Sequence, residues 1–129
     1  MIILFGSTGY IGSEFKRQLE ELKLPFFCWP NSSKTTFADL EKWYDDAGYP
    51  FIGTVINAAG YTGKPNVDAC EQHKQETIHG NVVFPLQLEA ANPVTPVVHI
   101  TSGCVYTGYK AGGWTEEDAP NFDFNNGSF

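Results

Sequence analysis

Residues 2–12 read IILFGSTGYIG, a short apolar run followed by three glycines at intervals of three. A continuous apolar run of this length is typical of a buried parallel strand. After the glycines, apolar residues recur at helical spacing from Ile11 to Leu24, and Pro25 ends the pattern. A strand, a glycine turn and a helix in this order form the setting in which such glycines bind the phosphates of a dinucleotide.

The three glycines have separate roles in this interpretation. Gly6 permits the tight turn, Gly9 lets the backbone approach a pyrophosphate, and Gly12 allows the helix and the strand to pack closely. The amides near Tyr10 and Ile11 would face the phosphates at the positive end of the helix. The predicted cofactor-binding residues of this segment are Gly6, Thr8, Gly9, Tyr10, Ile11 and Gly12. The alternative is a turn that serves only the fold.

Strands and helices alternate along the rest of the chain. The pattern predicts strands over residues 25–30, 54–57 and 96–100, and helices over 39–47, from Asn66 or Asp68 to 75, and over 75–91. Pro85 should kink or split the last helix. Its inward residues are expected to be Ile78, Val82, Leu86 and Leu88. Because this alternation implies right-handed crossovers, we predict one α/β domain over residues 1–129, with a Rossmann-like doubly wound parallel sheet.

Composition narrows the class of partner. The 129 residues carry a formal net charge of −7, which disfavours nucleic acid or an anionic membrane because both need basic patches. We find neither a signal peptide nor an apolar segment of membrane-spanning length. The three cysteines form no Cys-x-x-Cys pair, so we expect reduced thiols, no metal site and a cytoplasmic protein. His73, His79 and His99 lack ligand spacing and are expected to be structural.

The end of the second predicted strand lacks the acidic residue that would hold the adenosine ribose. The chain reads PNSSK there, over residues 30–34. With hydroxyls and one lysine in place of a carboxylate, the sequence favours NADP and NAD equally. A plain solvated loop is the alternative.

Two further motifs directly follow predicted strands. The small residues of Asn57-Ala58-Ala59-Gly60 would let the backbone lie against a flat ligand, or would simply pack a strand-to-loop turn. In Thr101-Ser102-Gly103-Cys104, a hydroxyl can bind a substrate carbonyl and a thiol can exchange a proton next to a carbonyl. Cys104 could instead be a small buried apolar residue. Because ligands bind beyond the carboxyl ends of parallel strands, we expect both motifs to share a site with the glycine turn.

Four segments in order resemble the extended short-chain dehydrogenase/reductase family: GSTGYIG, INAAGYTGKPNVDACE, GNVVFPLQL and HITSGCVYTG. Within that family the chain is most similar to the dTDP-4-dehydrorhamnose reductase-like branch, and especially to bifunctional 3,5-epimerase/4-reductases of nucleotide-linked rhamnose. Residues 57–68, 102–106 and 117–122 carry that finer likeness. The resemblance implies an NAD(P)H-dependent enzyme of a nucleotide-linked 4-keto-6-deoxy sugar. Members of the family often form homodimers.

The resemblance also implies roles for individual residues. Ser102 would be the catalytic hydroxyl that orients the C4 carbonyl, and Cys104 would transfer the proton in epimerisation. Ala58, Ala59, Gly60 and Tyr61 would flank the cofactor, next to Asn57 and Thr101. Asn81 would steady the neighbouring loops, and Asn31 and Ser32 could meet a 2′-phosphate.

The family's catalytic Tyr-x-x-x-Lys pair should follow Ser102 by about 20 to 30 residues, and it is missing up to Phe129. We therefore expect these residues to be the N-terminal part of an enzyme, an incomplete Rossmann domain truncated before the last strands and the C-terminal substrate lobe. Alone it should be inactive, with apolar surface uncovered on one sheet face and at an edge strand. The alternatives are a non-catalytic NAD(P)-binding regulatory module, a truncated gene product, or a nucleotide-sugar 4,6-dehydratase or 4-epimerase.

Overall fold

The computed structural model describes residues 1–30, 34–47, 53–92, 94–101 and 105–122. Its centre is a parallel sheet in the order β2-β1-β3-β4, as the alternating pattern predicts. The strands are β1 (Ile2–Phe5), β2 (Phe26–Cys28), β3 (Thr54–Asn57) and β4 (Val97–His99). Their register places Phe5, Asn57 and His99 side by side, so three strands end at one edge of the sheet.

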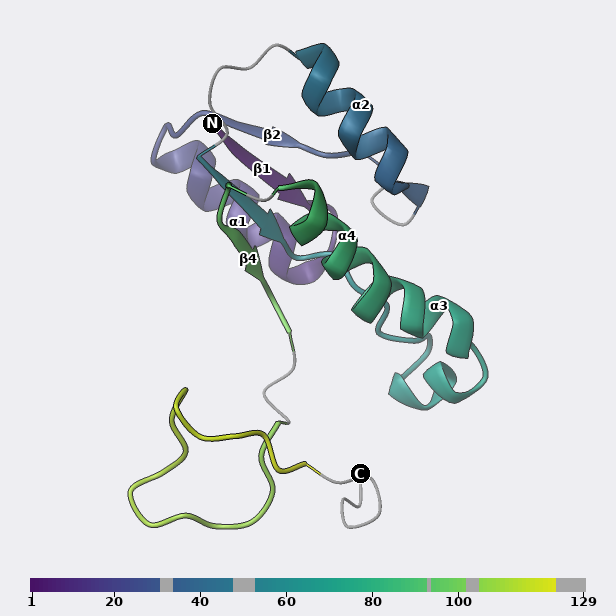
Figure 1. Ribbon diagram of the computed structural model, residues 1–129, viewed down its shortest axis with the longest axis vertical. Helices are drawn as coiled ribbons and strands as arrows, with labels where there is room; N and C mark the ends of the chain where they lie inside the picture. The colour runs from purple at the N-terminus through teal and green to yellow at the C-terminus, as the bar shows by residue number, and fades with distance from the viewer. Residues whose placement is uncertain (31–33, 48–52, 93, 102–104, 123–129) are drawn as a thin grey trace.

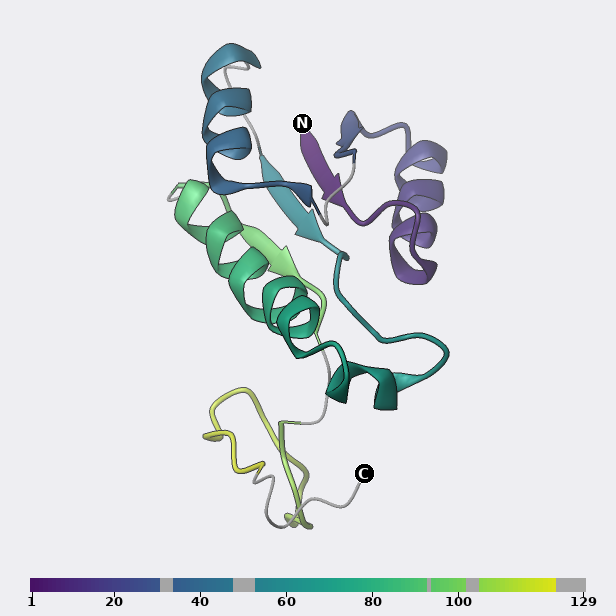
Figure 2. The same ribbon diagram turned by 90° about the vertical axis from the view of Figure 1, so that its right-hand side faces the viewer.

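Helices cover both faces of the sheet. Helix α1 (Tyr10–Glu21) lies on one face, while α2 (Phe37–Ala47) and α4 (Phe84–Ala91) lie on the other (Figures 1 and 2). Alternation along β1 divides the core accordingly, because successive strand side chains point to opposite faces. Leu4 packs with Leu19 of α1, while Ile3 and Phe5 pack with residues of α2 and α4.

The larger core cluster is aromatic and lies beneath the carboxyl ends of the strands. The Phe5 ring stacks on Trp29 with a centroid distance of 5.2 Å and meets Phe84 edge-on at 5.6 Å. The buried indole Nε1 of Trp29 donates to Thr35 Oγ1 at 2.7 Å, which satisfies its polar atom. Leu40 and Leu88 complete the buried contact between the sheet and its two helices.

Two helix boundaries differ from the sequence prediction. Helix α1 ends at Glu21, earlier than the predicted Leu24, because Lys23 adopts a left-handed conformation (φ 53°) before the proline. Helix α2 begins at Phe37, two residues before the predicted start. Thr36 Oγ1 accepts from the Asp39 amide at 3.2 Å, and the Asp39 carboxylate accepts from the Thr36 amide at 2.9 Å. This reciprocal capping box is made of polar residues, so the spacing of apolar residues did not predict the helix start.

The region predicted as helices from Asn66 to 75 and over 75–91 departs from regular α-helix in three places. A 3-10 helix, η2 (Val67–Glu71), is followed by His73, whose backbone (φ −119°, ψ 51°) is not helical. Then α3 (Lys74–Ile78) continues into a π-helical segment, η3 (His79–Val83), and into α4. The π segment lies one turn before Pro85, where the missing amide and the bulky ring disfavour regular α-helix. Pro85 does not split the helix, which continues from η3 through it into α4.

The predicted inward face of this helix is largely wrong. Leu88 is buried, but Ile78, Val82 and Leu86 are 55%, 52% and 65% exposed. Phe84 and Leu88, four residues apart, face the sheet instead. Val98 of the edge strand β4 is also 47% exposed, in line with the expected uncovered apolar surface.

Residues 105–122 form a loop beyond β4 with its own internal contacts (Figure 1). The Tyr106 ring stacks on Trp114 with a centroid distance of 4.8 Å. The ammonium of Lys110 pairs with the Asp118 carboxylate, and this contact, together with the Thr115 amide, holds the pKa of Asp118 below its ordinary value. No helix within the described ranges has the length and apolar character needed to cross a membrane.

Candidate functional site

A cavity of about 1010 Å³ lies at the carboxyl ends of the strands. Seven of the predicted site residues line it: Gly6, Thr8, Gly9, Ala58, Ala59, Gly60 and Tyr61. The glycine turn after β1 and the small residues after β3 therefore meet in one place. The other described residues of the prediction do not line the cavity: Tyr10, Ile11, Gly12, Asn57, Asn81 and Thr101.

Gly6 and Gly12 are required by the protein's own packing. Gly6 has a positive φ of 75°, and a Cβ there would lie 2.5 Å from the Ala59 nitrogen. A Cβ on Gly12 would lie 2.0 Å from the Gly6 carbonyl oxygen. At Gly9 a Cβ would meet only that same oxygen, at 3.4 Å. The absence of a side chain at Gly9 therefore leaves room on the cavity side, as close approach of a phosphate would require.

Helix α1 begins beside this cavity, directly after the lining residue Gly9. Gly9 is the N-cap in extended conformation (φ −77°, ψ 170°), and the helix begins at Tyr10. The first amides of any helix lack an acceptor within the helix and lie at its positive end. Tyr10 and Ile11 have exposed side chains, at 96% and 48%, and the role predicted for them belongs to their backbone amides.

Asn57 is fully buried and shapes the site from below. Its Oδ1 accepts from the Ala59 amide at 3.0 Å, and its Nδ2 donates to His99 Nδ1 at 3.1 Å. The side chain thus fixes the turn after β3 and links it to β4. Its polar atoms are occupied by the protein, so the structure supports a positioning role and not direct contact with a cofactor.

Asn81 connects the helix η3 to the loop after β3. Its Oδ1 accepts from the Tyr61 amide at 2.7 Å, and its Nδ2 donates to the Tyr61 carbonyl at 2.8 Å. Both backbone groups of Tyr61 are therefore paired by one side chain, as a neighbouring strand would pair them. This contact is the geometry that a loop-steadying asparagine needs.

Four predicted residues lie outside the described part of the chain: Asn31, Ser32, Ser102 and Cys104. Thr101 is described and exposed, directly beyond the carboxyl end of β4. The Ile100 amide donates to the Asn57 carbonyl at 2.9 Å, which extends the pairing of β3 and β4 up to this point.

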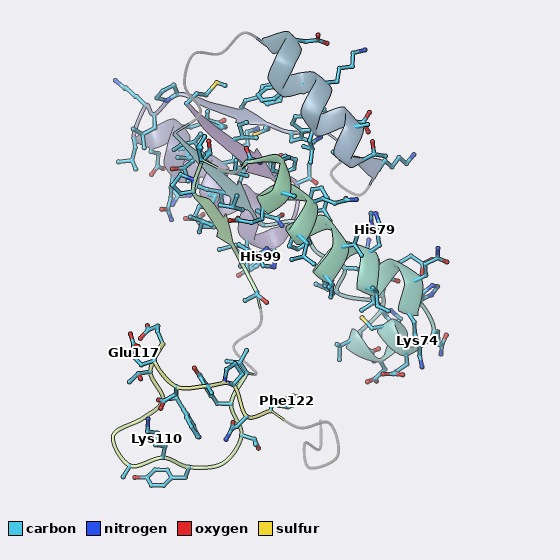
Figure 3. The ribbon with its side chains drawn as sticks, viewed as in Figure 1. Lys74, His79, His99, Lys110, Glu117 and Phe122 are labelled. Atoms are coloured by element: carbon cyan, nitrogen blue, oxygen red, sulfur yellow. The ribbon has the colours of Figure 1, made fainter. Side chains whose placement is uncertain are left out.

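Several lining residues escaped the sequence analysis. They are Ser7, Cys28, Trp29, Pro30, Gln75, Glu76, His79, Gly80 and Phe84. Ser7 and the residues around Trp29 could have been found, because they sit in the glycine turn and at the end of the second strand. His79 was expected to be structural, but its side chain is exposed and lines the cavity (Figure 3). Only tertiary folding brings α3 and η3 over the strand ends.

These residues fit a dinucleotide. Helix-terminal amides, a glycine turn without side chains and a floor of alanines suit a pyrophosphate and flat rings. The cavity volume is also of the size that cofactors occupy. The fold is of the Rossmann type, and its cavity suits a dinucleotide.

The chain belongs to the RmlD substrate binding domain family, whose model matches residues 1–122. Over 128 residues it is 33% identical to the bifunctional dTDP-4-dehydrorhamnose 3,5-epimerase/dTDP-4-dehydrorhamnose reductase of Arabidopsis thaliana, covering 93% of this chain and 41% of that protein. It is also 33% identical to the trifunctional RHM3 protein of the same plant, a UDP-glucose 4,6-dehydratase, 3,5-epimerase and reductase, over 93% of this chain and 19% of that protein.

Solved structures share the fold at low identity. The L780 UDP-rhamnose synthase of Acanthamoeba polyphaga mimivirus superposes with a TM-score of 0.79 at 24% identity, over 95% of this chain and 45% of that one. The Bacillus anthracis dTDP-4-dehydrorhamnose reductase, solved with NADP, gives a TM-score of 0.72 at 16% identity, over 92% and 42%. The chain therefore spans less than half the length of each of these relatives.

Proposed function

We propose that residues 1–129 are an incomplete Rossmann domain and form the cofactor-binding part of an NAD(P)H-dependent reductase of nucleotide-linked 4-keto-6-deoxy sugars. The same protein would also carry 3,5-epimerase activity. One observation carries the proposal: the glycine turn and residues 58–61 converge on a single cavity of dinucleotide size. The Arabidopsis relative that is 33% identical over 93% of this chain is named for both activities.

Separate residues of the chain would then bind the cofactor and act on the sugar. The turn from Gly6 to Gly9 and the first amides of α1 bind the pyrophosphate, while Ala58 to Tyr61 flank the rings. The bound dinucleotide supplies the hydride for C4 of the sugar. Ser102 orients the C4 carbonyl by donating a hydrogen bond, and Cys104 removes and returns a proton at C3 or C5. Thr101, beyond the end of β4, precedes both of them.

Dinucleotide binding can be tested on the chain itself. Trp29 lines the cavity, so its fluorescence should change when NADPH or NADH is added. Saturable binding of at least one of the two is the expected result. If neither binds to folded protein, the proposed function is wrong.

The chemistry can be tested on a chimera in which residues 1–129 replace the matching part of the bifunctional Arabidopsis protein. With a 4-keto-6-deoxy nucleotide sugar, the chimera should oxidise NADPH. Cys104→Ala should abolish proton exchange at C3 and C5 but retain direct 4-reduction. A folded chimera that binds NADPH but never oxidises it refutes the reductase assignment, and equal loss of both activities in Cys104→Ala refutes the role of the thiol.

A further inference from the structure

Part of the wall of the cavity is formed by α3 and η3. Gln75, Glu76, His79 and Gly80 contribute to it. The loop after β3 lies directly on this helix, because a Cβ on Gly80 would be 3.2 Å from both the nitrogen and the Cβ of Tyr61. The adjacent Asn81 holds Tyr61 by two hydrogen bonds. The contacts of Gly80 and Asn81 with Tyr61 therefore hold the backbone next to His79 in place at the cavity wall.

His79 itself begins the π-helical segment η3. Such segments are rare, and they often occur at functional sites because they redirect side chains. The His79 side chain leaves the helix on the side of α2 (Figure 3). Its imidazole makes no hydrogen bond or ion pair with any residue that the structure describes. It is thus exposed, lines the cavity and is available to a ligand.

The end of β2 contributes Cys28, Trp29 and Pro30 to the same cavity. In this fold the adenosine ribose lies at that strand end, and its 2′ position distinguishes NADP from NAD. None of these three residues offers a cation to a 2′-phosphate. Among the described residues that line the cavity, His79 alone has a side chain that can be positively charged. The lining residue Glu76 carries a carboxylate, and its Oε1 lies 3.9 Å from His73 Nδ1, so the neighbour of this carboxylate is His73 and not His79.

We infer that His79 is a specificity-determining residue that favours NADP(H) over NAD(H). Its imidazolium would donate a charge-assisted hydrogen bond to the 2′-phosphate of the adenosine ribose. NAD(H), with a hydroxyl at this position, would gain nothing comparable. This inference rests on the proposed dinucleotide site and adds a selection among its ligands that the described lining residues at the end of β2, Cys28 to Pro30, do not provide.

The test is a calorimetric titration of the chain with NADP⁺ and with NAD⁺. His79→Gln keeps a hydrogen-bond donor without the charge, and His79→Arg keeps the charge. His79→Gln should weaken NADP⁺ binding about tenfold and leave NAD⁺ binding unchanged, as expected for the loss of one exposed charge-assisted contact. His79→Arg should retain the preference for NADP⁺. Because His79 is exposed, both variants should unfold at the wild-type denaturant concentration.

The exposed Lys42 of α2, which does not line the cavity, provides a matched control. Lys42→Gln should not change the ratio of the two affinities. The inference is overturned if His79→Gln weakens both dinucleotides equally, if it leaves NADP⁺ binding intact, or if Lys42→Gln changes the ratio as much as His79→Gln does. Failure of the wild-type chain to bind either dinucleotide is a different result, because it removes the proposed function and this inference together.

Discussion

Gly12→Ala should destabilise the fold strongly without touching the cavity. A Cβ at this position would lie 2.0 Å from the Gly6 oxygen, 2.6 Å from the Gly6 carbonyl carbon and 3.1 Å from the Ser7 Cα. Ordinary contact begins near 3.4 Å, so the turn and the helix would have to separate by about 1.4 Å. All three obstacles are backbone atoms and cannot turn aside as a side chain could.

The cost follows from what that separation disrupts. Helix α1 is held on the sheet by Leu19, which packs on Leu4 and Ile56. Overpacking a tight contact costs about 1–3 kcal/mol, and a clash between backbones belongs at the upper end. We expect about 3 kcal/mol in the free energy of unfolding. With a slope of about 1.5 kcal/mol per molar urea, the unfolding midpoint would fall by roughly 2 M.

Gly9→Ala is the matched control. Gly9 has a negative φ, and a Cβ there would lie 3.4 Å from the nearest atom, so stability should change by less than about 1 kcal/mol. Because Gly9 lines the cavity, the added methyl group should, however, weaken NADPH binding. Urea unfolding followed by tryptophan fluorescence, together with an NADPH titration, measures both effects. If Gly12→Ala is as stable as wild type, or Gly9→Ala unfolds as early as Gly12→Ala, the division of roles between these glycines is wrong.

Three more predictions concern the elements around the cavity. Asn81→Ala should cost about 1–2 kcal/mol and speed hydrogen exchange of the Tyr61 amide, because both of its bonds to Tyr61 are lost; unchanged exchange would contradict this. Thr36→Ala should cost about 1 kcal/mol through the lost cap of α2. Hydrogen bonds from Thr36 lower the pKa of Asp39 from its ordinary value of 3.8. The stabilisation they give is complete above pH 3.8 and is lost as the pH falls through the lower pKa of the folded state. The free energies of unfolding of wild type and Thr36→Ala should therefore converge as the pH is lowered. Phe84→Ala should cost about 3–5 kcal/mol by opening a cavity beside Phe5, and a loss below 1 kcal/mol in thermal unfolding would refute its place in the core.

The sequence predicted those parts of the fold that local patterns determine. Strand β3 (Thr54–Asn57) agrees to the residue, and the turn from Gly6 to Gly12 lies between β1 and α1 as expected. These segments succeed because one buried strand and one glycine pattern each have a single low-energy arrangement. Helix ends were less accurate, since the capping box at Thr36 and the left-handed Lys23 are polar or conformational features outside the apolar pattern.

The face of the α3–η3–α4 helix could not be derived from its sequence. Leu86 and Leu88 are two residues apart, about 200° around a helix, and cannot both face the sheet. The aromatic contact between Phe84 and Phe5 selects the face with Leu88. That choice depends on residues almost eighty positions apart, so periodicity within the helix cannot make it. The same tertiary contact brings His79 to the cavity, which explains why it was assigned to the structure and not to the site.

Two asparagines explain how the cavity keeps its shape once the strands have ended. Beyond β3 the Ala58 amide still pairs with the Phe5 carbonyl of β1. After that, Asn57 binds the Ala59 amide and Asn81 binds both backbone groups of Tyr61. Each amide side chain supplies a partner, from within the protein, to backbone groups that lie beyond the strands. A loop ordered in advance lowers the entropic cost of binding. Affinity for the common part of a dinucleotide should therefore depend on these internal contacts, whereas selection between dinucleotides is left to side chains that remain free, of which His79 is the clearest case.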